Sequence, residues 1–167
     1  MPYRGFMGGA AVFFVVASGT LFAAGSSHAA RTTTTVERPR VEYVLSDKSL
    51  ARAAKAAVRA AKREGRQRVT VVIMERSGII RLVVRTRRSG PQTYESAKRK
   101  AYTAVAFGQP TSRLTDNPVI DKIPGTLTLP GGVPVTHKGF PIAGVGVGGA
   151  PDGRIDERIA RAVRSAL

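Results

Sequence analysis

Apolar and charged residues recur with a helical period between Ser46 and Glu64, and this pattern predicts the first helix of the chain. One side of the predicted helix is rich in alanine, which favours close packing against a sheet, and the other side carries lysine and arginine. Ser46 or Asp47 supplies an N-cap, and Gly65 ends the helix.

The next two apolar runs predict a β-hairpin. The first run, Val69–Glu75, is continuously apolar, so we expect it to be a central strand. Arg76-Ser77-Gly78 forms the turn, in which Gly78 suits a positive φ. The second run, Ile79–Thr86, then returns beside the first.

A second helix is predicted from Thr93 to Phe107, where Gly108-Gln109-Pro110 breaks the periodicity. Thr111 or Ser112 caps a short helical piece that ends at about Asp116. The remaining chain predicts three short strands and a closing helix, which are Leu127–Leu129, Val133–Val135, Ile142–Val147 and Asp152–Ala166.

Glycines alternate with apolar residues near the end of the last predicted strand, at Gly144, Gly146 and Gly148, and Gly149 follows. This alternation indicates a strand that another backbone approaches closely. Hairpins joined by helices predict a single α+β domain, with an antiparallel sheet and helices on its faces.

The N-terminal segment has the order of a secretory signal peptide. Arg4 is its only charged residue, an apolar run follows, and Ser27 and Ala29 suit cleavage after Ala29. We therefore expect residues 1–29 to be a signal peptide, with an uncleaved membrane anchor as the alternative. Residues 30–45 are Thr-rich and aperiodic, so they are expected to be a flexible tether to a folded domain at 46–167. Either alternative places the domain outside the cytoplasmic membrane, secreted or associated with the cell wall.

Charge and cysteine content narrow the range of functions. The 167 residues carry a net charge of +16, which falls to +15 when Arg4 leaves with the signal peptide. The lack of cysteine excludes thiolate catalysis, thiolate-bound metals and disulfides. A basic exported protein implies an anionic neighbour, such as cell-wall polymers. Specific nucleic-acid binding is not expected, since aromatic side chains are not interleaved with the basic ones.

Catalytic chemistry has little support in the sequence. His137 is the one histidine after the leader, and no nucleophile-elbow motif accompanies it. The acidic residues are expected to cap helices and form salt bridges. A haem group needs an axial ligand, and His137, Met74, Tyr43, Tyr94 and Tyr102 are the residues of ligating type.

Three blocks of sequence together resemble the GlcG/HbpS family. They are Gly90–Val105 with Pro110-Thr111-Ser112, then Ile123–Leu127 with Pro130–Val135, and then Gly139–Ala150 followed by Asp156-Glu157. The blocks occur in the family's order and extend over residues 45–167. The resemblance implies a profilin-like α+β domain with a five-stranded antiparallel sheet. It also implies a homo-oligomer, an octamer in HbpS, and a haem ligand held in a crevice near the second helix.

The resemblance also implies site residues and a partner. Thr111 in Pro-Thr-Ser is the position that matches the family's haem-coordinating threonine. His137 is the other candidate iron ligand, on the ground of its residue type and not of the resemblance. Lys98, Arg99 and Arg113 are expected to pair with the haem propionates, and Tyr102 lies beside Lys98 and Arg99 in the sequence. A membrane sensor kinase is the implied protein partner, in redox and haem sensing. Family iron sites use carboxylates near the hairpin, where this chain has only Glu75.

The sequence thus supports two functions of different classes. The first is an exported haem-binding protein that sequesters haem or assists a haem- or redox-sensing system. The alternative is a basic, cell-wall-associated binding module without haem. An enzymatic activity has the least support.

Overall fold

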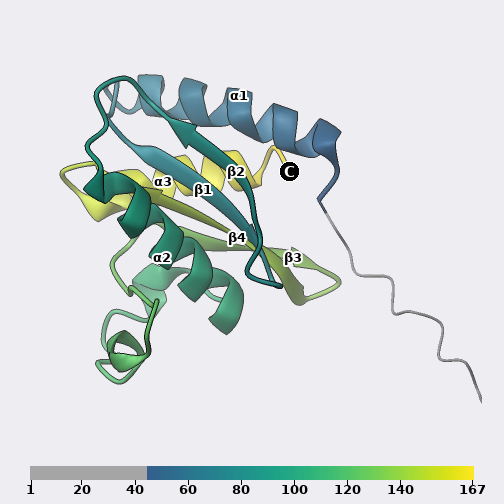
Figure 1. The fold of residues 1–167 in the computed structure, drawn as a ribbon, viewed down its shortest axis with the longest axis vertical. Coiled ribbons are helices and arrows are strands. Elements are labelled where there is room, and N and C mark those ends of the chain that lie inside the picture. Colours follow the sequence, from purple (N-terminus) through teal and green to yellow (C-terminus); the bar gives the residue numbers. More distant parts are fainter. Residues whose placement is uncertain (1–44) are drawn as a thin grey trace, which may run out of the picture. The chain divides into compact units, whose positions relative to one another are not determined.

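Helix α1 (Asp47–Arg63) opens the part of the chain that this computed structural model describes, residues 45–167 (Figure 1). Its N-cap is Ser46, whose hydroxyl accepts a hydrogen bond from the Ser49 amide at 3.2 Å. Its alanine-rich side is buried, as predicted. The predicted leader and all but the last residue of the predicted tether lie outside the described residues.

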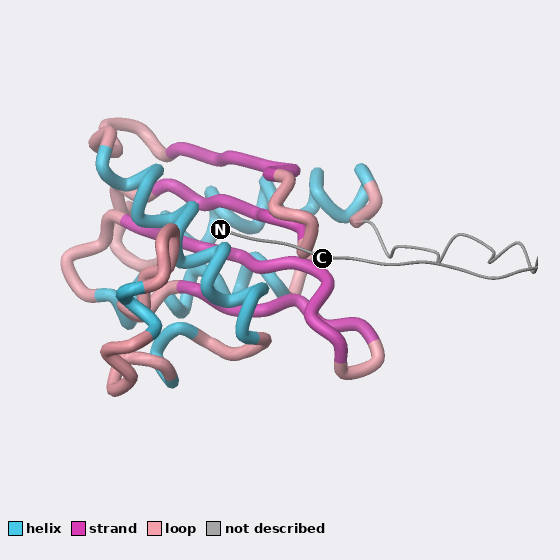
Figure 2. Tube along the Cα trace, turned by 60° about the horizontal axis from the view of Figure 1, so that its bottom comes forward, coloured by secondary structure: helices cyan, strands magenta, loops and turns pink. Residues whose placement is uncertain are grey.

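Four strands form one antiparallel sheet in the order β2-β1-β4-β3 (Figure 2). Their bounds are Thr70–Glu75 for β1, Ile80–Arg85 for β2, Gly132–His137 for β3 and Phe140–Gly148 for β4. Strand β1 is central, as its continuous apolar run predicted, and pairs with β2 through the predicted hairpin.

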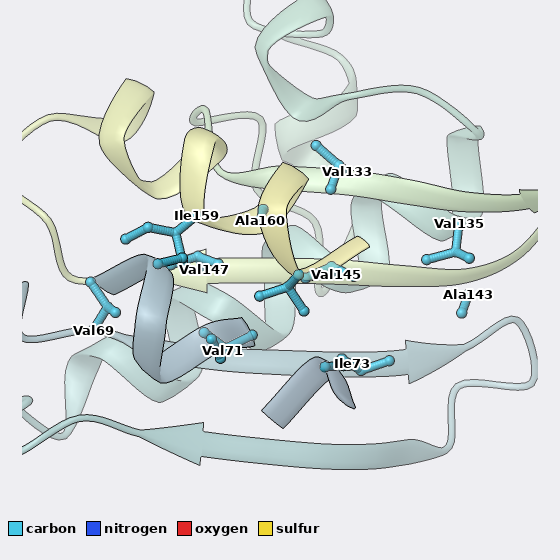
Figure 3. Packing of buried hydrophobic residues seen from close by; sticks show 14 of the residues in the cluster. Val69, Val71, Ile73, Val133, Val135, Ala143, Val145, Val147, Ile159 and Ala160 are labelled. Carbon is cyan, nitrogen blue, oxygen red and sulfur yellow. The ribbon is translucent and has the colours of Figure 1, made fainter. Parts of the chain in front are cut away.

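Helices cover both faces of the sheet. Alternate residues of β1 point to opposite faces, so Val71 and Ile73 enter the larger core with α1 and α3 (Gly153–Arg164). Figure 3 shows this core, in which Ile159 and Ala160 of α3 lie over valines of β1, β3 and β4. Val72 and Met74 enter a smaller cluster with α2 (Gln92–Phe107).

The glycines of β4 let α2 lie directly on the sheet. A Cβ atom at Gly144 would overlap the carbonyl oxygen of Ala101, and one at Gly146 would overlap that of Ala97. At Gly148 it would lie 2.8 Å from Ser96 Oγ. The close backbone approach predicted from the alternating glycines is therefore confirmed, and it fixes which side of α2 faces away from the sheet.

Within residues 45–167 the sheet has four strands, so the expectation of a fifth was wrong. Leu127–Leu129 does not pair with a strand, because side chains take up its backbone groups. Thr103 Oγ1 accepts from the Leu127 amide at 2.8 Å, and Asp121 accepts from the Thr128 amide at 3.0 Å. Thr111 Oγ1 donates to the Leu129 carbonyl at 2.8 Å. The segment is thus extended and held by side chains.

Two short 3₁₀ helices, Thr111–Arg113 and Ile120–Lys122, precede that segment. Only the first was predicted, and it is shorter than expected. Within residues 45–167, no helix has the length and apolar character needed to cross a membrane. The α+β class with helices on both faces of an antiparallel sheet is confirmed.

Candidate functional site

A cleft of about 460 Å³ lies on the α2 side of the sheet. The β1–β2 hairpin contributes Met74 and Gly78, and a loop contributes Pro124 and Gly125. Helix α2 contributes a row of polar and charged side chains. This volume is within the range of clefts that bind small molecules and cofactors.

The α2 residues of the cleft share one side of the helix because of their spacing. Glu95, Lys98, Arg99 and Tyr102 are three, four and seven residues apart, which places them together on adjacent turns. The β4 glycines hold the opposite side of α2, around Ala97 and Ala101, against the sheet. The cleft residues are therefore positioned by backbone packing and not by a mobile loop.

Two hydrogen bonds hold the loop of the cleft against α2. The Arg99 guanidinium donates to the Thr126 carbonyl, and the Leu127 amide donates to Thr103 Oγ1. The Thr126 hydroxyl is itself buried and donates to the carbonyls of Ile120 and Ile123. Gly125 has a φ of +87°, and its backbone lies against the Tyr102 ring. Hydrogen bonds thus hold the loop in place as one wall of the cleft.

The electrostatic character of the cleft is positive. Lys98 Nζ lies 3.5 Å from Glu95 Oε2, but both side chains are about half exposed, so this pair is weak. Lys98 also lies 6.0 Å above the centre of the Tyr94 ring. The Arg99 charge has no carboxylate partner among the described residues. An anionic group entering the cleft would therefore find two cations and one carboxylate.

The cleft also holds two side chains of a type that ligates haem iron. Both line the cleft, and their exposures differ. Tyr102 is 38% exposed, so its phenol is accessible to solvent, whereas Met74 is 4% exposed and its thioether is buried. Tyrosinate and methionine sulfur are both known axial donors. Apolar walls, two cations and two donors of this kind fit a haem group with its propionates.

The family of the chain follows from a family model described as "Haem degrading protein HbpS-like", which matches residues 45–165. The chain belongs to the HbpS-like family. A crystal structure of HbpS is 48% identical, with a TM-score of 0.69 over 75% of this chain and 91% of that chain. A double glutamate-to-aspartate variant of HbpS from Streptomyces reticuli is 41% identical, with a TM-score of 0.71 over 91% and 99%.

A third solved structure, a PduOC–haem complex, is 27% identical to this HbpS-like chain. Its TM-score is 0.68, over 75% of this chain and 96% of that chain. No curated protein sequence matches the chain. The sequence-based resemblance to the GlcG/HbpS family is thus confirmed.

The structure brings together three of the six site residues that the sequence indicated in this HbpS-like chain. Lys98, Arg99 and Tyr102 line the cleft. Arg113 is exposed on the first 3₁₀ helix, and His137 is half-buried at the end of β3, where it pairs with Phe140. Neither contributes to the cleft.

Thr111 has a structural role in the HbpS-like fold. It is fully buried, and its hydroxyl donates to the Leu129 carbonyl and accepts from the Gly132 amide at 2.9 Å. Iron ligation by this oxygen would require it to leave both partners. Its assignment as an iron ligand remains a prediction. Tyr102 and Met74, and not Thr111, are the residues of ligating type that line the cleft.

Lys100 is buried on the sheet side of α2, unlike Lys98 and Arg99, which line the cleft. Lys100 Nζ lies 2.9 Å from Asp156 Oδ2 and donates to the Val147 carbonyl at 3.0 Å, and both side chains of the pair are buried. Burial raises the pKa of Asp156, while Lys100 and the Ala150 amide act in the opposite direction. The helical spacing of Lys100 from Ala97 and Ala104, both on the sheet side of α2, is the signal that could have revealed it.

Several other acids form the ion pairs and caps that were expected of them. Glu75 pairs with Arg81, Glu157 pairs with Arg161, and Asp152 caps α3. Among residues 45–167, no group of three histidine, aspartate or glutamate side chains could hold a metal ion.

Proposed function

We propose that the chain is an exported haem-binding protein that holds haem in the cleft beside α2. The observation that carries this proposal is the convergence of Lys98, Arg99, Tyr102 and Met74 on one cleft of about 460 Å³. Membership of the HbpS-like family and the haem bound by the related PduOC structure support it.

The residues of the cleft have separate roles in this proposal. The apolar walls bury the macrocycle and exclude water. Lys98 and Arg99 bind the propionates through charge-assisted hydrogen bonds. Tyr102 or Met74 donates to the iron. Haem supplies the redox-active iron centre, and the chain supplies its binding, orientation and electrostatic environment.

The cellular role that we propose is haem sequestration, or assistance to a membrane sensor kinase in haem or redox sensing. Export by the predicted signal peptide is part of this proposal. We also propose a homo-oligomer, octameric as in HbpS. This part of the proposal is supported by membership of the HbpS-like family.

Hemin titration of the full chain tests the proposal, with the Soret band as the readout. Haem carries two carboxylates and adheres to any basic surface, so an unrelated protein of similar positive charge is one control. The internal control is Arg154→Gln, which removes an exposed cation outside the cleft. We expect saturable, stoichiometric binding that Lys98→Gln weakens about tenfold, as for the loss of one charge-assisted bond, and Arg154→Gln leaves unchanged.

Substitution of the donors tests the ligand assignment. Tyr102→Phe or Met74→Leu is expected to move the Soret and visible bands of the ferric complex, whereas Thr111→Ala and His137→Ala are not. A spectral change confined to Thr111→Ala would contradict the cleft assignment and support the ligand that the family resemblance implied, and one confined to His137→Ala would support the histidine instead. Binding no stronger than that of the basic control protein would remove haem as the ligand.

A further inference from the structure

The positive charge of the protein is unevenly neutralised. Arg158 and Arg161 of α3 are paired with Glu64 and Glu157, and Lys100 of α2 is paired with Asp156. The outward side of α1, in contrast, carries five cations with no aspartate or glutamate partner among the described residues, which are Lys48, Arg52, Lys55, Arg59 and Lys62. We call these five residues the α1 basic row.

The row is straight because of its spacing. Its members follow one another at intervals of four, three, four and three residues, which aligns them along a single line of the helix. The line extends for about 21 Å at the rise of an α-helix. All five residues are exposed, and α1 lies at the edge of the described part in Figure 1.

The two acids at the ends of α1 do not neutralise the row. Asp47 lies 3.5 Å from Arg81, and Glu64 accepts two bonds from Arg158. Arg158 lowers the pKa of Glu64 through those bonds. Arg52 donates to the backbone oxygens of Ala166 and Leu167, and the other four members make no side-chain hydrogen bond in the described structure.

A hollow of about 240 Å³ lies at the C-terminal end of the row. Its cations are Lys62, Arg66 and Arg87, and its lining includes no acid. The Thr86 hydroxyl fixes the arrangement, since it donates to the Gln67 carbonyl at 2.9 Å and accepts from the Val69 amide at 2.8 Å. The row thus ends in a concave site that can take one anionic group.

Two arginines at this end of the row have an unusual backbone conformation. Arg66 has a φ of +57° and Arg88 a φ of +63°, in the left-handed region that glycine and asparagine adopt more easily. Both arginines are exposed. Arg66 lines the hollow, and Arg88 follows the lining residue Arg87 in the sequence.

We propose that the α1 basic row binds a linear polyanion of phosphate groups, with one phosphate in the hollow between Lys62, Arg66 and Arg87. This site is separate from the haem cleft and does not depend on it. The line of cations fits an extended chain, and the hollow fits a single tetrahedral anion better than it fits a flat layer of lipid headgroups. Nucleic acid is less favoured, because no aromatic side chain for base stacking lies in the row or the hollow.

Titration of the full chain with inorganic long-chain polyphosphate at several salt concentrations tests this site. The row variant is Lys55→Gln/Arg59→Gln/Lys62→Gln. The matched control is Lys122→Gln/Arg154→Gln/Arg164→Gln, which removes the same charge from exposed positions elsewhere, two of them on α3. A second variant, Arg66→Asn, removes a hollow cation while its residue type suits the positive φ, so it is expected to fold at least as well.

The row variant is expected to bind polyphosphate about tenfold more weakly or worse, and to flatten the dependence of log K on log salt by about 2. Arg66→Asn is expected to weaken binding, and the control to retain it. Unchanged far-UV circular dichroism and an unchanged hemin titration show that the row variant is folded with its cleft intact.

Equal loss of binding in the row variant and the control would overturn the proposal, because only net charge would then matter. Row-dependent binding to phosphatidylglycerol vesicles without binding to polyphosphate would also overturn it, in favour of a membrane surface. Tighter binding to single-stranded DNA than to polyphosphate would overturn it in favour of nucleic acid.

Discussion

Lys100 and Asp156 form the one ion pair of the described residues in which both side chains are almost fully buried, with 4% and 3% exposure. Lys100→Met leaves the Asp156 carboxylate buried without its cation, so we expect the free energy of unfolding to fall by about 3–5 kcal/mol at pH 7. Urea denaturation measures the change. Lys98→Met is the control, because its pair with Glu95 is half exposed, and we expect a change of about 0.5 kcal/mol or less. A loss below about 1 kcal/mol for Lys100→Met would contradict full burial of the pair.

The same residue pair predicts a pH dependence with a definite sign. Burial already raises the pKa of Asp156 above 3.8, and the loss of Lys100 raises it further. Between pH 3.8 and the raised pKa of Asp156, the native state binds a proton that the unfolded chain does not. The free energy of unfolding of Lys100→Met therefore gains a contribution as the pH falls through this range. We therefore expect the deficit of Lys100→Met relative to the natural chain to shrink from pH 7 to pH 5. Lys100→Met/Asp156→Asn should not show this narrowing, and a deficit that stays constant with pH in Lys100→Met would refute the assignment.

At the scale of elements, the contact between α2 and β4 decides where the cleft residues stand. Gly146→Ala places a methyl group against the Ala97 carbonyl, so the helix must move away from the sheet. We expect a loss of about 1–3 kcal/mol, which corresponds to a Tm lower by several degrees. Gly90→Ala is the matched control, because its methyl group meets only the flexible Gln92 side chain. Scanning calorimetry of both variants checks the difference, and equal Tm values would show that α2 has room to shift.

Elements with a clear period or a distinctive residue type could be predicted from the sequence. The helices, the hairpin and the close approach at the β4 glycines all follow from local pattern. Leu127–Leu129 could not be excluded as a strand, because its side-chain partners Thr103, Thr111 and Asp121 are distant in sequence. Three of the six predicted site residues, Thr111, Arg113 and His137, lie outside the cleft. Their positions also depend on contacts between segments that are distant in sequence. A motif match shows which residues the family shares, but not whether a hydroxyl such as that of Thr111 is already bonded inside the fold.

At the scale of the whole described domain, the two cores are unequal but share the central strand. Val71 and Ile73 belong to the large core and Val72 and Met74 to the small one, so β1 couples the two faces of the sheet. We expect a single cooperative unfolding transition. The chain lacks tryptophan, and two of its four tyrosines, Tyr94 and Tyr102, lie on α2.

Tyrosine fluorescence therefore reports in part on α2, and far-UV circular dichroism reports on all helices and the sheet. In urea, the two signals are expected to change at the same midpoint. The Tyr94→Phe and Tyr102→Phe variants identify how much of the fluorescence change comes from α2. If the fluorescence changed at lower urea than the circular dichroism, α2 would detach before the sheet unfolds. The cleft would then open independently of the large core, and haem, as a ligand that binds only the closed cleft, would bring the two midpoints together.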